Sequence, residues 1–159
     1  IAFPGMTANF DAAKSAALAV TMLDWRDYGE DYVAEMVLMA KTLASCLEEY
    51  DVPVFFGVLG HTQSHQFAVL ANEYRGGQEA SKLLRTSGFL ACGIGLPVQD
   101  IEGDMNGIRF GTPELVRWGM TAKHSNKLAD LIAKALNSQN VSDQVSEWRR
   151  TFNKIHFVN

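Results

Sequence analysis

The hydrophobic pattern changes its period near residue 50, and this change constrains the fold more than any other feature of the sequence. Between residues 31 and 50, apolar side chains such as Val33, Met36, Val37 and Ala40 recur at spacings of three and four. This spacing predicts an amphipathic helix of about five turns. After residue 50 the apolar runs become short and rich in β-branched and aromatic residues, which is typical of strands.

The elements that we expect follow this change in order. A first helix is expected over residues 12–25, with Asn9 or Asp11 as its N-cap, and Gly29 is expected to interrupt it before the helix at 31–50. Strands are predicted at 52–58, 65–71, 89–97 and 107–111. Further helices are predicted at 76–88, from Pro113 with Thr112 as N-cap, at 123–137 and at 141–157. This order predicts an α+β fold, with a long helical arm followed by a small, mainly antiparallel sheet that helices cover on one face.

The composition is typical of a soluble globular protein, with 47% hydrophobic and 20% charged residues. A net charge of −4 provides no basic surface, so no nucleic-acid partner is expected. No apolar run approaches the roughly 20 residues that span a bilayer, so no membrane association is expected. Cys46 and Cys92 make neither a disulfide framework nor a zinc site, and no signal peptide is visible, which indicates a cytoplasmic protein.

Arg109 is the most unusual residue of the predicted sheet, because it lies inside the apolar run 107–111. A buried guanidinium needs a partner, since an unpaired buried cation is very costly. One interpretation is an internal ion pair with an acidic residue such as Glu114. The other is a binding site for a carboxylate, whose two oxygens match two parallel N–H donors of arginine. Physical chemistry alone favours the ion pair.

Three further features of the sequence involve residue types that can bind ligands or react. His61 and His65 have the spacing of helical metal ligands, but the sequence around them predicts a turn entering a strand, and no third ligand is near, so no metal site is expected. Residues 3–11 place a proline-glycine turn before a helix, where backbone N–H groups favour an anion such as phosphate, with Thr7 and Asn9 as additional donors. Cys92 is expected to be a packing residue.

Two segments together resemble a known family. The stretch FPGMTANF near the start and NGIRFGTPELVRWGM at 106–120 resemble the C-terminal part of serine hydroxymethyltransferases, which are pyridoxal-phosphate (PLP) enzymes of the aspartate-aminotransferase fold type, fold type I. The resemblance extends from Phe3 to about Leu136, and it includes His65 and the proline-ended stretch ACGIGLP. The Gly-Ile-Arg-x-Gly-Thr-Pro element is its most specific part.

The resemblance implies that Arg109 binds the α-carboxylate of a small amino-acid substrate, which reverses the preference for an ion pair. It also implies that the Phe-Pro-Gly turn reaches the PLP phosphate of the neighbouring subunit of a homodimer, with Thr7 and Asn9 as cofactor-binding residues. The fold that it implies is the C-terminal domain of fold-type I enzymes. Residues 1–50 would then be a helical segment leading from a large PLP-binding domain outside this chain, and residues 51–159 the small α+β domain.

The sequence departs from the family pattern in three places. Met6, Ala8 and Asn9 replace glycines of the phosphate turn, so a close backbone approach is less assured. Ile94 stands where the family's folate-binding stretch has an asparagine, which leaves the use of tetrahydrofolate open. The family's Schiff-base lysine lies upstream of the Phe-Pro-Gly turn, and none of the seven lysines here has that place. We therefore expect a C-terminal fragment that contains no catalytic residue and is inactive alone.

The expected function of the complete protein is that of a PLP-dependent hydroxymethyltransferase or aldolase. Such an enzyme would cleave or form the Cα–Cβ bond of a β-hydroxy amino acid, as in the interconversion of serine and glycine. Three alternatives stay open: a folate-independent aldolase, an aminotransferase or racemase on the same scaffold, and a non-catalytic module for substrate recognition or dimerisation. A lysine in a Ser/Thr-His-Lys context upstream would distinguish the enzyme from the module.

Overall fold

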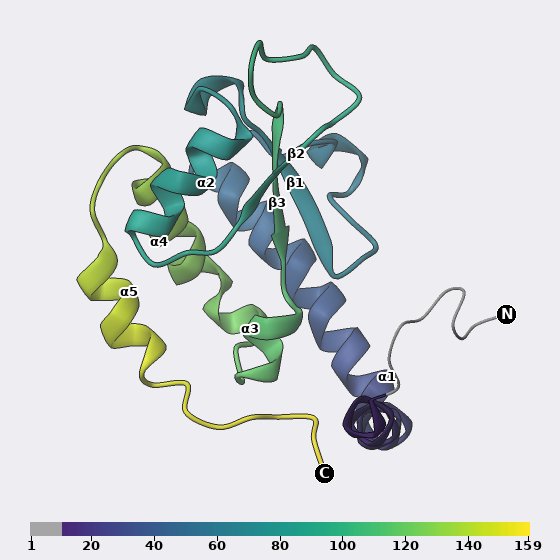
Figure 1. The fold of residues 1–159 in the computed structure, drawn as a ribbon. Coiled ribbons are helices and arrows are strands. Elements are labelled where there is room, and N and C mark those ends of the chain that lie inside the picture. Colours follow the sequence, from purple (N-terminus) through teal and green to yellow (C-terminus); the bar gives the residue numbers. More distant parts are fainter. Residues whose placement is uncertain (1–10) are drawn as a thin grey trace, which may run out of the picture.

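The α+β fold predicted from the sequence is confirmed by the computed structural model, which describes residues 11–159. One long helix precedes a small sheet and four shorter helices (Figure 1). The helices are α1 (Ala12–Glu49), α2 (Gly77–Thr86), α3 (Pro113–Arg117), α4 (Ser125–Leu136) and α5 (Ser142–Arg149). The strands are β1 (Gln66–Leu70), β2 (Cys92–Ile94) and β3 (Gly107–Gly111). Short 3-10 turns lie at Gly57–Leu59, Asn72–Tyr74 and Ala122–His124.

The sheet is antiparallel throughout and has β3 at its centre, in the order β1-β3-β2. Because side chains alternate along a strand, β3 places Ile108 and Phe110 on one face and Arg109 on the other. Ile108 is fully buried, and the Phe110 ring stacks on the Phe67 ring of β1 with centroids 5.6 Å apart. The face that carries Ile108 and Phe110 packs on the core, while the face that carries Arg109 is open.

Helices α1 and α2 pack against the sheet on its core side, and α4 packs on both of these helices (Figure 1). The second half of α1 supplies buried side chains, including Met39, Leu43 and Leu47, each no more than 1% exposed. Helix α4 contributes Leu128, Leu131 and Ile132 to the same core. Residues on both sides of position 50 share this core. The predicted division of the chain near residue 50 stays a prediction.

Helix α1 is a single helix of 38 residues, so the predicted interruption at Gly29 is wrong. Asp11 is the N-cap, as one of the two predictions had it, because its carboxylate accepts hydrogen bonds from the backbone N–H groups of Ala13 and Lys14. A glycine inside a helix costs only about 1 kcal/mol, which the packing of a long helix readily offsets. The Trp25 ring lies against Gly29, where a Cβ would stand 2.9 Å from Cε3 of that ring.

The first half of α1 leaves large apolar side chains in contact with solvent. Leu18, Val20 and Met22 are 61%, 56% and 64% exposed. None of the helices within residues 11–159 is both long and apolar enough to cross a membrane.

Three predicted elements differ from the structure. The strand expected at 52–58 is reduced to one isolated bridge between Val54 and Val69. Phe56 adopts a left-handed conformation, with φ of 56°, and so turns the chain away from the sheet. Strand β2 is shorter than the prediction of 89–97. The last helix ends at Arg149 and not at 157, because the residues after it make long-range contacts instead of helical ones.

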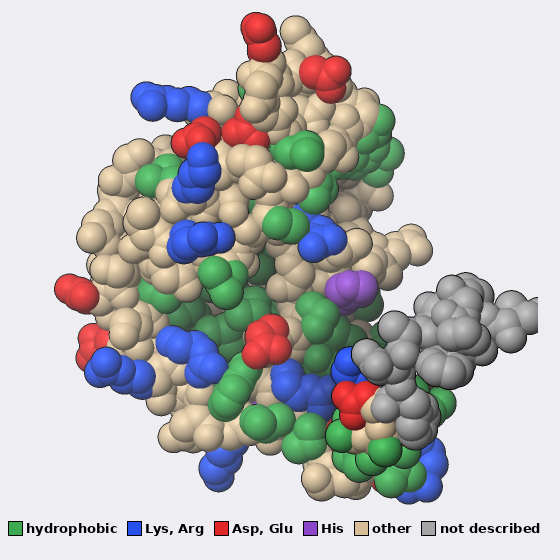
Figure 2. Space-filling view, in the orientation of Figure 1, with side chains coloured by type: hydrophobic (Ala, Val, Ile, Leu, Met, Phe, Trp, Pro, Cys, Tyr) green, Lys and Arg blue, Asp and Glu red, His purple; other side chains and the backbone are tan. Residues whose placement is uncertain are grey.

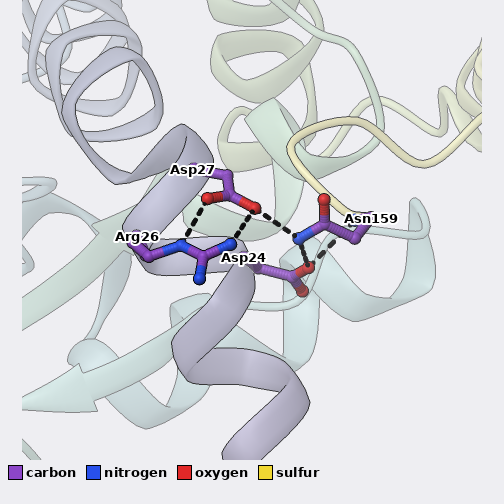
Figure 3. Close-up of polar contacts among 4 residues, drawn as sticks. All are labelled: Asp24, Arg26, Asp27 and Asn159. Carbon is purple, nitrogen blue, oxygen red and sulfur yellow. Dashed lines mark hydrogen bonds and ion pairs between the residues drawn. The ribbon is translucent and has the colours of Figure 1, made fainter.

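The segment 156–159, here called the strap, runs back across α1 and α3. The His156 N–H donates to the Arg117 carbonyl oxygen at 2.8 Å, and the Phe157 ring stacks on the Tyr32 ring at 5.2 Å. Figure 3 shows Asn159 beside two aspartates of α1: its backbone N–H donates to Asp24 at 2.9 Å and its side-chain amide to Asp27 at 3.2 Å.

The Asp27 carboxylate is fixed by an ion pair on its own helix. Arg26 donates to both of its oxygens, with the shorter contact at 2.6 Å (Figure 3). The hydrogen bond from Arg26, supported by the one from Asn159, holds the pKa of Asp27 below its ordinary value, although desolvation acts in the opposite direction. The strap therefore binds to a carboxylate that stays charged.

Candidate functional site

Arg109 lies at the middle of the central strand, on the open face of the sheet. It is opposite Ala68 of β1 and Cys92 of β2. The side chain is exposed, so the expectation of a buried cation is wrong: strand alternation directs the side chain to solvent while its neighbours Ile108 and Phe110 point into the core. The small side chains on either side leave the guanidinium open to a ligand.

The ion pair between Arg109 and Glu114 is not formed. Glu114 instead accepts a hydrogen bond at 2.8 Å from the indole N–H of Trp118, the residue that follows α3. None of the hydrogen bonds or ion pairs found among residues 11–159 engages the Arg109 side chain. A guanidinium that is held on a rigid strand, and that no carboxylate of the described chain neutralises, can bind an anionic ligand.

A groove of about 490 Å³ opens beside Arg109 on this face. Its walls come from the ends of β1 and β3 and from the segment that enters β2. The lining residues are His65, Gln66, Leu90, Ala91, Cys92, Arg109, Gly111 and Pro113. One cation among mostly small or apolar groups suits a small ligand that carries a single carboxylate.

Thr112 lies between two residues that line the groove, Gly111 and Pro113. It stands at the predicted N-cap position of α3, but its side chain does not cap the helix. Its hydroxyl makes no cap hydrogen bond. It lies 2.8 Å from the Met36 carbonyl oxygen and 3.1 Å from the His65 carbonyl oxygen, and it can donate to either. Thr112 is fully buried, and these partners satisfy a hydroxyl that burial would otherwise leave unpaired.

Comparisons with known proteins show to which family the chain belongs. No family model matches the chain. The chain is 52% identical over 162 residues to an α-methylserine aldolase from Ralstonia sp, a match that covers 99% of this chain and 37% of that protein. It is 35% identical over 162 residues to a serine hydroxymethyltransferase from Methanopyrus kandleri, covering 98% of this chain and 38% of that protein. The chain belongs to this family of fold-type I PLP enzymes.

A solved structure agrees with this membership. An L-threonine transaldolase from Pseudomonas fluorescens superposes with a TM-score of 0.77 at 25% identity, over 87% of this chain and 32% of that one. The chain spans little more than a third of the length of the curated relatives it matches and corresponds to the C-terminal part of these enzymes. The predicted resemblance to the family is therefore confirmed.

His61 and His65, the pair singled out by its spacing, lie in different places. His61 lies 2.7 Å from the Glu48 carboxylate at the end of α1. His65 borders the Arg109 groove, and its ring Nδ1 lies 3.4 Å from the Ser64 hydroxyl. Among residues 11–159 no three His, Cys, Asp or Glu side chains come together as a metal site would require. Of the two, only His65 shares a site with Arg109.

Asn106 is a structural polar residue that the sequence analysis missed. It is 3% exposed, and its side-chain amide donates to the Leu96 carbonyl oxygen and accepts from the Leu96 N–H at 2.6 Å. It thereby fixes the loop that follows β2 and carries Pro97. Its place just before the Gly-Ile-Arg element could have suggested a loop anchor. Ile94 pairs with Gly107 at the far end of the same strands, on the same face as Arg109.

The predicted phosphate contacts, Thr7 and Asn9, lie outside the described residues. Cys92, predicted to be a packing residue, is half-buried and lies opposite Arg109. Its thiol therefore borders the groove.

A second cavity of about 470 Å³ lies on the other side of the sheet, between β3 and helices α3, α4 and α5. Apolar side chains dominate its lining, among them Leu43, Phe110, Leu115, Met120, Ile132 and Trp148. Figure 2 shows apolar side chains gathered in a hollow of this face with basic side chains around it. Glu114 and Arg149 are the charged residues of its lining, so the cavity offers little to a polar substrate.

Proposed function

We propose that the complete protein to which this chain belongs is a PLP-dependent enzyme that cleaves or forms the Cα–Cβ bond of a β-hydroxy amino acid. The observation that carries this proposal is Arg109, a cation exposed at the centre of a rigid sheet beside a groove of about 490 Å³. The names of the relatives, which are α-methylserine aldolase, serine hydroxymethyltransferase and L-threonine transaldolase, support the same reaction class.

The role of this chain is to bind and orient the amino acid. The Arg109 guanidinium donates two parallel hydrogen bonds to the α-carboxylate and so fixes the rotation of the substrate about its Cα–N bond. When bound, PLP supplies an electron sink for the pair of electrons left at Cα. Which bond to Cα is broken depends on this orientation. Arg109 therefore contributes to reaction specificity as well as to substrate affinity.

The groove fits the amino-acid end of such a site, because a single cation faces open space between small side chains. We propose that Thr7 and Asn9 contact the PLP phosphate, and that they do so in a homodimer whose sites combine residues of both subunits. We also propose that the protein is cytoplasmic.

A folate-independent aldolase is the second candidate, and Ile94 favours it. An aliphatic side chain offers no hydrogen bond to a pterin, whereas aldol cleavage to a free aldehyde needs none at that place. The relatives named α-methylserine aldolase, at 52% and 46% identity, support this candidate over a hydroxymethyltransferase.

An assay of the complete enzyme distinguishes a hydroxymethyltransferase from a folate-independent aldolase. The enzyme is loaded with PLP and given serine or α-methylserine, with and without tetrahydrofolate. Formaldehyde release from α-methylserine that folate does not change would support the aldolase. Glycine formation from serine that requires folate would support the hydroxymethyltransferase. Transfer of the amino group to a keto acid, without cleavage of either substrate, would contradict both.

A further inference from the structure

The corner where β3 turns into α3 is held by helix α1 at two points. The Thr112 hydroxyl lies 2.8 Å from the Met36 carbonyl oxygen, and the Tyr32 hydroxyl donates to the Pro113 carbonyl oxygen at 2.8 Å. Tyr32 and Met36 are four residues apart, so they lie on the same face of α1. Two consecutive residues of the corner are therefore attached to consecutive turns of one helix.

The same corner forms a wall of the Arg109 groove. Gly111, Pro113 and His65 line the groove, and both the N–H and the hydroxyl of Thr112 lie within hydrogen-bond distance of the His65 carbonyl oxygen, at 3.0 Å and 3.1 Å. Thr112 thus ties the end of β3, the start of β1 and helix α1 together. It stands three residues after Arg109, directly after the strand that directs the guanidinium.

Tyr32 is itself fixed from several sides. Its side chain is 6% exposed. Its ring stacks on Phe157 of the strap at 5.2 Å, and the Arg117 guanidinium lies over it at 4.5 Å. Arg117 in turn donates to the Phe157 carbonyl oxygen at 2.6 Å. A hydroxyl held in this way is a rigid anchor for the Pro113 carbonyl.

We propose that Thr112 and Tyr32 are positioning residues for the carboxylate site, through which helix α1 sets the orientation of Arg109. The proposal rests on the proposed role of Arg109 as the carboxylate ligand. A bidentate contact requires its donors to be held within about 0.5 Å and 10–20° of the productive geometry. A corner attached by two hydrogen bonds to the longest helix meets that requirement, whereas a loop free to shift would not.

The test is a comparison of glycine with methylamine, which differ by the carboxylate alone, in the complete PLP-loaded enzyme. Glycine has no β-hydroxyl group and so cannot undergo the cleavage reaction. Calorimetry gives both dissociation constants. We expect Thr112→Val, which keeps the shape but removes the hydroxyl, to weaken glycine binding roughly 5- to 10-fold, as the loss of one buried hydrogen bond implies. Methylamine binding should not change, and Thr112→Ser should restore glycine binding.

Tyr32→Phe is the second variant, because it removes only the hydroxyl and keeps the ring stacking. It should show the same selective loss of glycine affinity. Two matched controls lie on α1 or at its end. Thr42→Val removes a hydroxyl that donates within the helix to Leu38, and Tyr50→Phe removes one that donates to Asn126. Tyr50 is about 27 Å from Tyr32 along the helix. Both controls should bind glycine as the unmodified enzyme does.

The proposal is overturned if Thr112→Val and Tyr32→Phe leave glycine affinity unchanged, or weaken glycine and methylamine equally. It is also overturned if Thr112→Ser behaves like Thr112→Val. Arg109→Ala separates this result from the proposed function. If Arg109→Ala leaves glycine affinity unchanged, the carboxylate role itself is wrong. If Arg109→Ala weakens glycine binding and the two positioning variants do not, only the inference of this subsection fails.

Discussion

At the scale of single residues, the character of Arg109 depends on which face of β3 it occupies. Both of its sequence neighbours are buried: Ile108 is 0% exposed and Phe110 is 8% exposed. Arg109 itself is exposed. A cation on the open face needs no internal partner, since water solvates it until a ligand arrives. The site therefore contains an accessible cation without the desolvation penalty of a buried one.

Arg109→Ala should reduce kcat/KM of the complete enzyme for its amino-acid substrate by about 1.5 to 3.5 orders of magnitude. The physical reason is that a hydrogen-bonded charge pair at the centre of a site is worth roughly 2–5 kcal/mol. Arg109→Lys should recover only part of the lost activity, because an ammonium group cannot donate two parallel hydrogen bonds to a carboxylate as a planar guanidinium does. Steady-state kinetics measures both, with the exposed Arg85→Ala of α2 as control. Unchanged kinetics for Arg109→Ala would contradict the assignment.

Gly77 shows a second effect at the residue scale, because α2 approaches the sheet closely at this glycine. A Cβ at position 77 would overlap the carbonyl oxygen of Gly107 in β3. Gly77→Ala should therefore lower the free energy of unfolding by about 1–3 kcal/mol through overpacking. Urea denaturation measures the change. Gly95→Ala is the control, since a Cβ there meets nothing within 4 Å, and equal effects of the two substitutions would contradict the prediction.

At the scale of elements, α2 begins without a capping side chain of its own. Its N-cap is Gly76, and the cap is supplied from the loop before β3, where the Asp104 carboxylate accepts hydrogen bonds from the N–H groups of Gln78 at 2.9 Å and Glu79 at 3.1 Å. Desolvation raises the pKa of Asp104, but the backbone hydrogen bonds and the charge of Lys82 outweigh it and leave the pKa below its ordinary value. The cap thus joins two elements distant in sequence.

Because of Asp104, the free energy of unfolding should decrease as the pH becomes acidic. Because its pKa is lowered in the folded state, the carboxylate stabilises the fold above the unfolded pKa of about 4, and this contribution is lost as pH falls through the folded pKa. Asp104→Asn should lower the urea concentration at the unfolding midpoint at pH 7. The difference between the midpoints at pH 7 and pH 3 should therefore be smaller in this variant than in the unmodified protein. Asp100→Asn, in the same exposed loop, is the control. An unchanged pH profile for Asp104→Asn would contradict this account.

At the scale of the whole molecule, the first half of α1 exposes more apolar side chains than a helix that faces solvent normally does. Leu18 and Met22 are 61% and 64% exposed and lie one turn apart. A helix with apolar residues on all its faces is normally buried. This surface suits the proposed homodimer, in which a partner subunit would cover it.

Met22→Glu should weaken the assembly of the complete enzyme, because a charged side chain would be placed where apolar surface is expected to be buried. Sedimentation velocity across a range of protein concentrations measures the dissociation. Thr86→Glu, on the exposed side of α2, introduces the same side chain away from α1 and should have no effect. If Met22→Glu assembles as tightly as the unmodified protein, this half of α1 is not part of the interface.

Much of the fold was predictable because it depends on local patterns. The period of the apolar residues indicated a helix before residue 50 and strands after it, and the structure contains α1, β1 and β3 at those places. The errors fall where long-range contacts compete with local preference. Gly29 does not break a helix whose remaining turns are well supported, and residues 150–157 leave the predicted helix because the strap contacts α1 and α3 instead.

The sequence by itself determined the α+β class, the order of the elements and the presence of Arg109 in a motif of this family, since periodicity and motif spacing are properties of neighbouring residues. Only the tertiary structure decided that Arg109 faces solvent, that Thr112 bonds to Met36, 76 residues away, and that Asn159 bonds to Asp24, 135 residues away. Those contacts depend on how the helices pack on the sheet. No local pattern encodes which distant carbonyl or carboxylate will meet a given donor.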